Sequence, residues 1–182
     1  TDGTTNGTKL FKDIREGLGD SFPSQFIIFN NKILFIANNG INGNALWETD
    51  GTENGTKLLK DIAVGKSTTA DLSNGILYNN KFYFFASDAN NGQELWATDG
   101  TTEGTNIVKD INVGSTGSYI NSNFIIYKDK LYFSANDGIN GTELWQTNGT
   151  ESETRIVEGF IENNDLNPKN FVNLNDKIFF LG

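Results

Sequence analysis

The fold of this chain is decided by the stretch Glu94–Thr101, which reads Glu-Leu-Trp-Ala-Thr-Asp-Gly-Thr. Closely similar stretches occupy Ala45–Thr52 and Glu143–Thr150, and the chain opens on Thr1–Thr4, the tail of a fourth copy. The tryptophans of these copies are 49 residues apart. A repeat of this length is typical of stacked supersecondary units that share one continuous core.

The spacing divides one domain, 1–182, into four repeat units of 48–49 residues. The units cover about 1–48, 49–97, 98–146 and 147–182, and the last is truncated before its own tryptophan. Each unit holds a two-residue turn between two apolar runs: Asn30-Asn31, Asn79-Asn80, Lys128-Asp129 and Asn175-Asp176. Asn and Asp tolerate positive φ, so these turns predict tight type I′ hairpins.

Four strands are expected in a complete unit. The first strands are Phe26–Phe29, Ile76–Tyr78, Phe124–Tyr127 and Phe171–Leu174. The second strands are Ile33–Ala37, Phe82–Ala86, Leu131–Ala135 and Ile178–Leu181. The Leu-Trp stretch is the third, and the fourth strands are Lys9–Ile14, Lys57–Ile62, Asn106–Ile111 and Arg155–Phe160.

The apolar pattern of these strands favours an all-β, β-propeller-like array of four-stranded antiparallel blades. Phe82–Ala86 does not alternate apolar with polar residues, which indicates a strand buried on both faces. Antiparallel sheets covered on both faces by like sheets are the blades of a propeller. A β-sandwich or another β-repeat is the alternative. We expect an arc of a longer propeller, and a small ring joining Lys9–Ile14 to Ile178–Leu181 is the other arrangement considered.

Composition excludes several classes of function. The formal net charge is -9, from 23 acidic and 14 basic residues, which disfavours nucleic acid and anionic membrane surfaces as partners. No apolar run approaches the roughly 18 residues of a membrane span, so no membrane insertion is expected. The chain lacks His, Cys and Met, which excludes His- or Cys-based catalysis and zinc sites built on those residues.

The repeated motif is interpreted as a packing and turn device. The tryptophans are expected to wedge between adjacent sheets. The Asp-Gly pair is typical of a turn in which Asp caps backbone N–H groups and Gly takes positive φ. The structural residues are Trp47, Trp96, Trp145, Asp50, Asp99, Gly51, Gly100 and Gly149. A sugar-stacking role for the tryptophans is the alternative.

The loops between second and third strands are the candidate ligand-binding region. They span 38–44, 87–93 and 136–142, are rich in Asp, Asn and Gly, and are expected to share one end of the sheets with the long crossovers. The ligand-binding candidates there are Asp20, Asp71, Asp88, Asn90, Asp137 and Asn140. Such oxygen-rich loops also suit Ca²⁺, although they lack EF-hand spacing. No pair of carboxylates is marked as catalytic, and no other cofactor is expected.

The units resemble the bacterial ELWxxDGT repeat. The resemblance is clearest over 98–111 and 131–145 and covers essentially the whole chain. It implies a propeller-like repeat protein that is exported or surface-associated, with no defined enzymatic activity. The copies depart from the pattern at Ala45, Asn148, Glu153, Glu158 and Gly159.

The expected function is therefore a non-enzymatic scaffold, extracellular or at the cell surface, that binds a protein or a glycan. Further blades of a parent chain are also expected as partners. A carbohydrate-binding or glycosidase-like propeller that uses carboxylates of the loop end is the alternative.

Overall fold

The computed structural model describes residues 1–62, 70–118, 123–158 and 165–182. These residues form three four-stranded antiparallel sheets and one two-stranded pair. The first sheet contains β1 (Ser24–Phe29), β2 (Lys32–Asn38), β3 (Asn44–Thr49) and β4 (Lys57–Lys60). The second contains β5 (Ala70–Tyr78), β6 (Lys81–Asp88), β7 (Gly92–Thr98) and β8 (Asn106–Lys109). The third contains β9 (Ile125–Tyr127), β10 (Lys130–Asn136), β11 (Thr142–Thr147) and β12 (Arg155–Ile156), and the last pair is β13 (Lys169–Leu174) with β14 (Lys177–Leu181).

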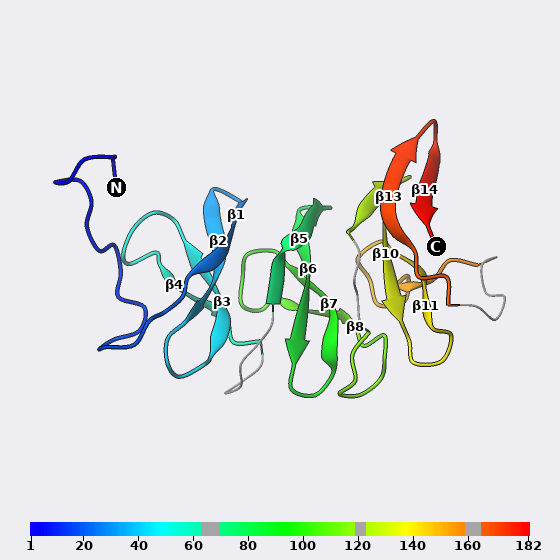
Figure 1. The fold of residues 1–182 in the computed structure, drawn as a ribbon, viewed down its shortest axis with the longest axis horizontal. Coiled ribbons are helices and arrows are strands. Elements are labelled where there is room, and N and C mark those ends of the chain that lie inside the picture. Colours follow the sequence, from blue (N-terminus) through cyan, green and yellow to red (C-terminus); the bar gives the residue numbers. More distant parts are fainter. Residues whose placement is uncertain (63–69, 119–122, 159–164) are drawn as a thin grey trace.

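The sheets stand side by side in chain order, as the blades of a propeller do (Figure 1). Within each four-stranded sheet, neighbouring strands follow one another along the chain. The all-β, four-stranded repeat is thus confirmed, and it forms an open arc. The first residues and β14 lie at opposite ends of this arc (Figure 1), so the small closed ring is wrong for this structure. Each sheet spans the boundary between two sequence repeats, because a fourth strand follows the motif that supplies the third.

One expected strand does not form. Lys9–Ile14 has no strand conformation, although its sequence matches the fourth strands elsewhere. The other fourth strands pair with the tryptophan strand of their own sheet, whereas Lys9–Ile14 pairs with no strand among the residues that the structure describes. Phe160, the expected end of the last fourth strand, lies outside the described residues.

The two-residue turns take the predicted conformation. Asn30 and Asn31 have φ of 50° and 60°, and the equivalent residues of the other three turns also have positive φ. Their hairpins pair Phe29 with Lys32 and Tyr78 with Lys81. The type I′ prediction is therefore confirmed.

Tryptophan lies at the same register in each four-stranded sheet. The cross-strand partners are Phe35 with Trp47, Phe84 with Trp96, and Phe133 with Trp145. We call the face that each sheet turns towards the preceding part of the chain its backward face, and the opposite face its forward face. The backward face of the second sheet is formed by Phe82, Phe84, Ala86 and Trp96.

Two apolar cores fill the spaces between sheets. Trp96 packs with the forward face of the first sheet, and Trp145 packs with that of the second. Trp47 packs with Phe35, Ala37, Ala45 and Ile14, and within the described residues this cluster includes no second sheet. The wedge prediction is therefore confirmed for Trp96 and Trp145.

Candidate functional site

The Asp-Gly-Thr turns lie at the hairpin end of the sheets and are occupied by their own hydrogen bonds. Asp99 Oδ1 accepts from Thr101 N at 2.9 Å and from Thr101 Oγ1 at 2.7 Å. The Thr101 hydroxyl lowers the pKa of Asp99, and although burial opposes this shift, the pKa stays below its ordinary value. Gly100 has φ of 89°, a conformation that favours glycine. The same turn forms at Asp2, Asp50 and Asn148, so its side chains serve the backbone.

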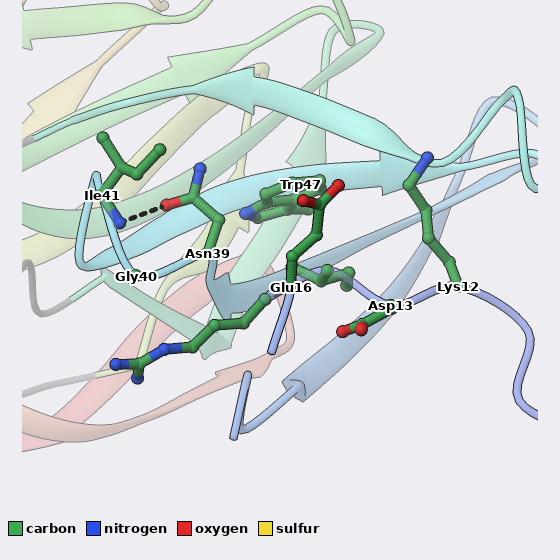
Figure 2. A pocket seen from close by; sticks show the side chains of 9 residues that line it. Lys12, Asp13, Glu16, Asn39, Gly40, Ile41 and Trp47 are labelled. Atoms are coloured by element: carbon green, nitrogen blue, oxygen red, sulfur yellow. Dashed lines mark hydrogen bonds between the residues drawn. The ribbon is translucent and has the colours of Figure 1, made fainter. Parts of the chain in front are cut away.

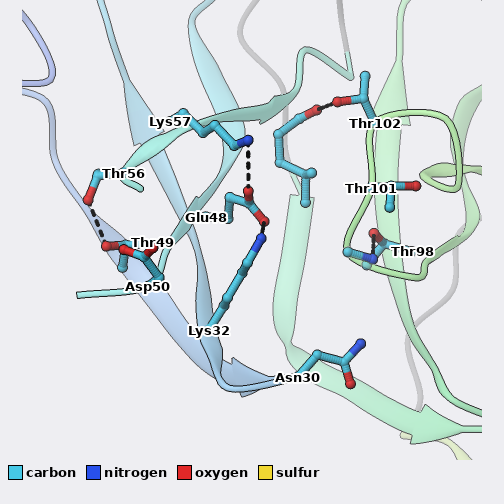
Figure 3. A network of polar contacts seen from close by, with 12 residues as sticks. Asn30, Lys32, Glu48, Thr49, Asp50, Thr56, Lys57, Thr98, Thr101 and Thr102 are labelled. Atoms are coloured by element: carbon cyan, nitrogen blue, oxygen red, sulfur yellow. Dashed lines mark hydrogen bonds and ion pairs between the residues drawn. The ribbon is translucent and has the colours of Figure 1, made fainter. Parts of the chain in front are cut away.

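The hairpin end of the first sheet also holds a buried carboxylate that is paired with two partly exposed lysines. Glu48 is 2% exposed and lies 2.8 Å from Lys32 Nζ and 3.5 Å from Lys57 Nζ (Figure 3). Ala97 and Gln146 take this position in the other sheets. The ion pair is therefore particular to one sheet and ties three of its strands together.

The loops at the opposite end have one shared internal geometry. In the second sheet, Asp88 Oδ1 accepts from Asn90 N at 2.8 Å and from Asn91 N at 2.6 Å, while its Oδ2 accepts from Asn91 Nδ2. Asp137 accepts in the same way from Ile139 and Asn140, including Asn140 Nδ2 at 2.7 Å. These Asx turns fix the loop backbone before any ligand arrives.

The first sheet forms the same loop with an amide in place of the carboxylate. Asn39 Oδ1 accepts from Ile41 N at 3.0 Å and from Asn42 N at 2.8 Å. Asn42 Nδ2 then donates to Asp61 Oδ2 at 2.6 Å, which anchors the loop to the segment after β4.

Each loop presents an exposed residue at its tip. Ile41 is 81% exposed and Ile139 is 88% exposed, and Asn90 holds the equivalent exposed position in the second sheet. These three residues are 49 apart in the sequence. The loop end therefore displays a row of similar, preformed loops whose tips face solvent.

Behind the loops lie buried carboxyl groups. Glu94 is fully buried and accepts from Ile111 N at 3.1 Å and Asn112 N at 3.2 Å. Burial raises the pKa of Glu94 to about 7, even though these hydrogen bonds oppose the shift. Both carboxyl oxygens of Glu94 hold the segment after β8 against β7, so the role of this side chain is structural.

Glu143 occupies the same position in the third sheet. Burial raises its pKa, with contributions from Asp165 and Asp137. Its Oε2 has no hydrogen-bond partner among the described residues, and the side chain is 1% exposed. For Asp137, burial favours a higher pKa, but hydrogen bonds from Asn140 and Ile139 outweigh it, and the pKa is lowered. Glu143 is thus enclosed by the described residues in this conformation.

The structure places the predicted ligand-binding residues at one end but does not gather them into a pocket. Asp71 accepts from Ser73 N and Asn74 Nδ2, and Asp20 is exposed beside Ser21, whose carbonyl accepts from Asn38 N. Asp88, Asp137 and Asn140 are used within their loops, which leaves Asn90 as the candidate that faces solvent at a tip.

The described residues contain no group of three or more carboxylates close enough to hold a metal ion. The same part of the chain holds no helix able to cross a membrane.

Trp47 borders a hollow of about 590 Å³ on the backward face of the first sheet (Figure 2). Lys12, Asp13, Glu16 and Asn39 supply its polar lining. Trp47 is nevertheless only 6% exposed, and Trp96 and Trp145 are 6% and 5% exposed. This burial leaves no ring face for stacking on a sugar.

Sequence reasoning missed two features of this end: the buried Glu94 and Glu143, and the exposed Ile41 and Ile139. The 49-residue period could have identified both. Glu94 and Glu143 precede the Leu-Trp pair in their copies, and Ile41 and Ile139 lie six residues before the tryptophan.

No family model and no curated protein matches the chain. One similar solved structure comes from an analysis of two prolyl endopeptidases, with 14% identity and a TM-score of 0.49 over 88% of this chain and 23% of that one. Another is an alpha-L-arabinofuranosidase from Clostridium thermocellum, with 13% identity and a TM-score of 0.35 over 87% of this chain and 59% of that one. The chain thus spans less than two thirds of either structure, and at these TM-scores neither likeness bears on its ligand or activity.

Proposed function

We propose that this chain is a non-enzymatic binding scaffold of an exported or cell-surface bacterial protein, and that its loop end contacts another protein or a glycan. The observation that carries the proposal is the row of preformed loops with exposed tips at Ile41, Asn90 and Ile139. The resemblance to the ELWxxDGT repeat supports the location and the scaffold role.

The loops suit recognition because they need little ordering on binding. Side chains of Asn39, Asp88 and Asp137 already hold the loop backbones through two hydrogen bonds each. A preorganised loop loses less conformational freedom on binding than a mobile one. The isoleucine tips favour a protein partner, because exposed apolar side chains gain most from burial against an apolar surface.

The arrangement of carboxylates supports binding over catalysis. Glycoside hydrolysis needs two carboxyl groups that reach the substrate. Glu94 and Glu143 are enclosed, and the oxygens of Asp88 and Asp137 accept hydrogen bonds within their own loops.

Labelled protein applied to a glycan array and to an array of purified secreted proteins tests the proposal. Binding should fall at least about tenfold in the double variant Ile41→Asp, Ile139→Asp, because charge at the tips opposes an apolar contact. Leu10→Asp is the matched control, since Leu10 is 80% exposed outside the loop end.

Two results would overturn the proposal. The first is equal loss of binding in the tip variant and the Leu10→Asp control. The second is turnover of a panel of nitrophenyl glycosides that disappears in Glu143→Gln, which would establish the glycosidase alternative.

A further inference from the structure

The last pair of strands carries an open apolar face. Val172, Leu174, Phe179 and Leu181 are 57%, 56%, 52% and 61% exposed. These residues lie at alternate positions of β13 and β14 and so point to one face of the pair. An apolar face of this kind is unusual on a protein surface and marks a contact site.

The repeat identifies the kind of surface that this face fits. Counted from the lysine after the hairpin turn, the four residues correspond to Ile76, Tyr78, Tyr83 and Phe85 in the second sheet. Those four belong to the core between the second and third sheets. The corresponding residues of the first sheet, Ile27, Phe29, Leu34 and Ile36, belong to the core between the first and second sheets. The open face is therefore a forward face that no sheet covers within the part of the chain that the structure describes.

The same protein carries an open backward face at its other end. Phe26 and Ile33 on the first sheet are 59% and 37% exposed. At the corresponding positions of the third sheet, Phe124 and Leu131 are 9% and 0% exposed, because the second sheet covers them. Phe26 stacks on Phe35, whose ring centroid lies 5.5 Å away, so the two rings extend this backward face outward.

Part of a sheet interface is already assembled there. Ile14 packs against Trp47 at the backward face of the first sheet, as Ile62 lies with Trp96 and Ile111 with Trp145 at the two internal interfaces. Ile14 therefore occupies, next to Trp47, the position that the residue after a fourth strand takes at the internal interfaces. Within the described residues, no inner strands of another sheet face Trp47. Among the described residues, strands β13 and β14 pair only with each other, and they correspond to the two inner strands of the other sheets.

We propose that two copies of this chain associate head to tail, with the forward face of β13–β14 in one copy packed on the backward face of the first sheet in the next. We choose a second copy as the partner because each internal interface packs a forward face on a backward face through the corresponding residues. The contact needs no new backbone pairing, since it is made face to face. It is heterologous, so each copy keeps one free face for a further copy.

Sedimentation velocity of the chain, run as a concentration series from about 1 to 300 μM, tests the proposal, because heterologous contacts extend with concentration. We expect dimers and then longer species as concentration rises. Phe179→Asp with Leu181→Asp should remove the tail surface, and Phe26→Asp with Ile33→Asp should remove the head surface. Each double variant alone should stay monomeric over this concentration range. Its dissociation constant for self-association should rise at least about tenfold, because a charge at an apolar contact is unfavourable.

Mixing the two double variants distinguishes this head-to-tail contact from a symmetric contact between two copies. The tail variant retains an intact head, and the head variant retains an intact tail, so an equimolar mixture should form dimers and nothing larger. Ile139→Asp is the control, since its loop tip belongs to neither face and the variant should associate as the unchanged chain does. That control also tells this proposal apart from ligand binding at the loop end.

Three outcomes would overturn the inference: a monomer at every concentration, association that survives both double variants, or a mixture that stays monomeric while the unchanged chain dimerises. The third result indicates a symmetric contact. Circular dichroism of each variant shows whether the sheets are retained, and the mixture remains decisive when one variant is less stable than the other.

Discussion

The second sheet and the last pair of strands have corresponding sequences but different surroundings. Tyr83 and Phe85 on β6 are 2% and 3% exposed, whereas Phe179 and Leu181 at the corresponding positions of β14 are 52% and 61% exposed. A residue in such an array is buried by the neighbouring sheet and not by its own. Stability therefore resides largely in the interfaces between repeats, as nearest-neighbour descriptions of repeat proteins hold.

The largest effect should come from removing an indole between two sheets. Trp96→Ala should lower the free energy of unfolding by about 3–5 kcal/mol, because it leaves a cavity in the core between the first and second sheets. Trp47→Ala should cost less, since the cluster around Trp47 has no second sheet. Urea denaturation of both variants measures the difference, and equal losses would contradict a dominant role for the interface.

A matched pair of truncations tests directly whether the neighbouring sheet determines the stability that a side chain contributes. Phe85→Ala should cost about 3–5 kcal/mol, because Phe85 is buried against Phe124, with ring centroids 4.5 Å apart. Leu181→Ala should cost under about 1 kcal/mol in dilute monomer, since the side chain is mostly exposed. The same denaturation experiment serves for both, and a large loss in Leu181→Ala would show that β14 is covered within the monomer.

The buried carboxyl of the second sheet should make stability depend on pH. Its folded pKa of about 7 lies above the ordinary value of 4.5, so the stability contributed by protonated Glu94 is fully present below about pH 4.5. It is lost as pH rises through about 7, at a cost of about 3 kcal/mol. Denaturation midpoints of the unchanged chain and Glu94→Gln, measured from pH 4 to 8, should differ in slope over this window. The first sheet provides a natural contrast, because Ala45 replaces the glutamate there, and parallel pH profiles would refute the assignment.

The smallest expected effect concerns the turns. Asp99→Ala should cost about 1 kcal/mol, because two hydrogen bonds to Thr101 are lost in a turn that joins two paired strands. Asp2→Ala removes the same bonds from a turn followed by Lys9–Ile14, which is unpaired, and should leave the melting temperature unchanged. Thermal melts of the two variants check the contrast, and a destabilising Asp2→Ala would mean that the first residues support the first sheet.

Much of the architecture could be predicted because local chemistry determines it. The Asn-Asn turns favour type I′ hairpins, and Phe82–Ala86 has apolar side chains on both faces, so the second sheet was expected to lie between two others. Lys9–Ile14 was predicted wrongly, because strand formation depends on a partner that a local pattern does not reveal. Its sequence differs from that of 57–62 only in having Phe11 where the other segment has Leu59.

The candidate site was predictable in place but not in detail. Asp88 and Asp137 were singled out as ligand-binding oxygens, and the structure shows those oxygens engaged by Asn91 and Asn140 three residues onward. Composition indicates that a loop is rich in oxygen atoms, but the direction of each lone pair depends on the turn conformation. The isoleucine tips went unnoticed because a single apolar residue in a polar loop resembles ordinary surface variation.

The tryptophans have one further property. Within the described residues, the indole N–H groups of Trp47, Trp96 and Trp145 are buried and have no hydrogen-bond partner. An indole in such dry surroundings emits at shorter wavelength than one in water, so each ring is a built-in optical reporter of its own interface. Replacing two of the three by Phe would leave a single emitter, and the order in which the interfaces open during unfolding could be followed by fluorescence, one junction at a time.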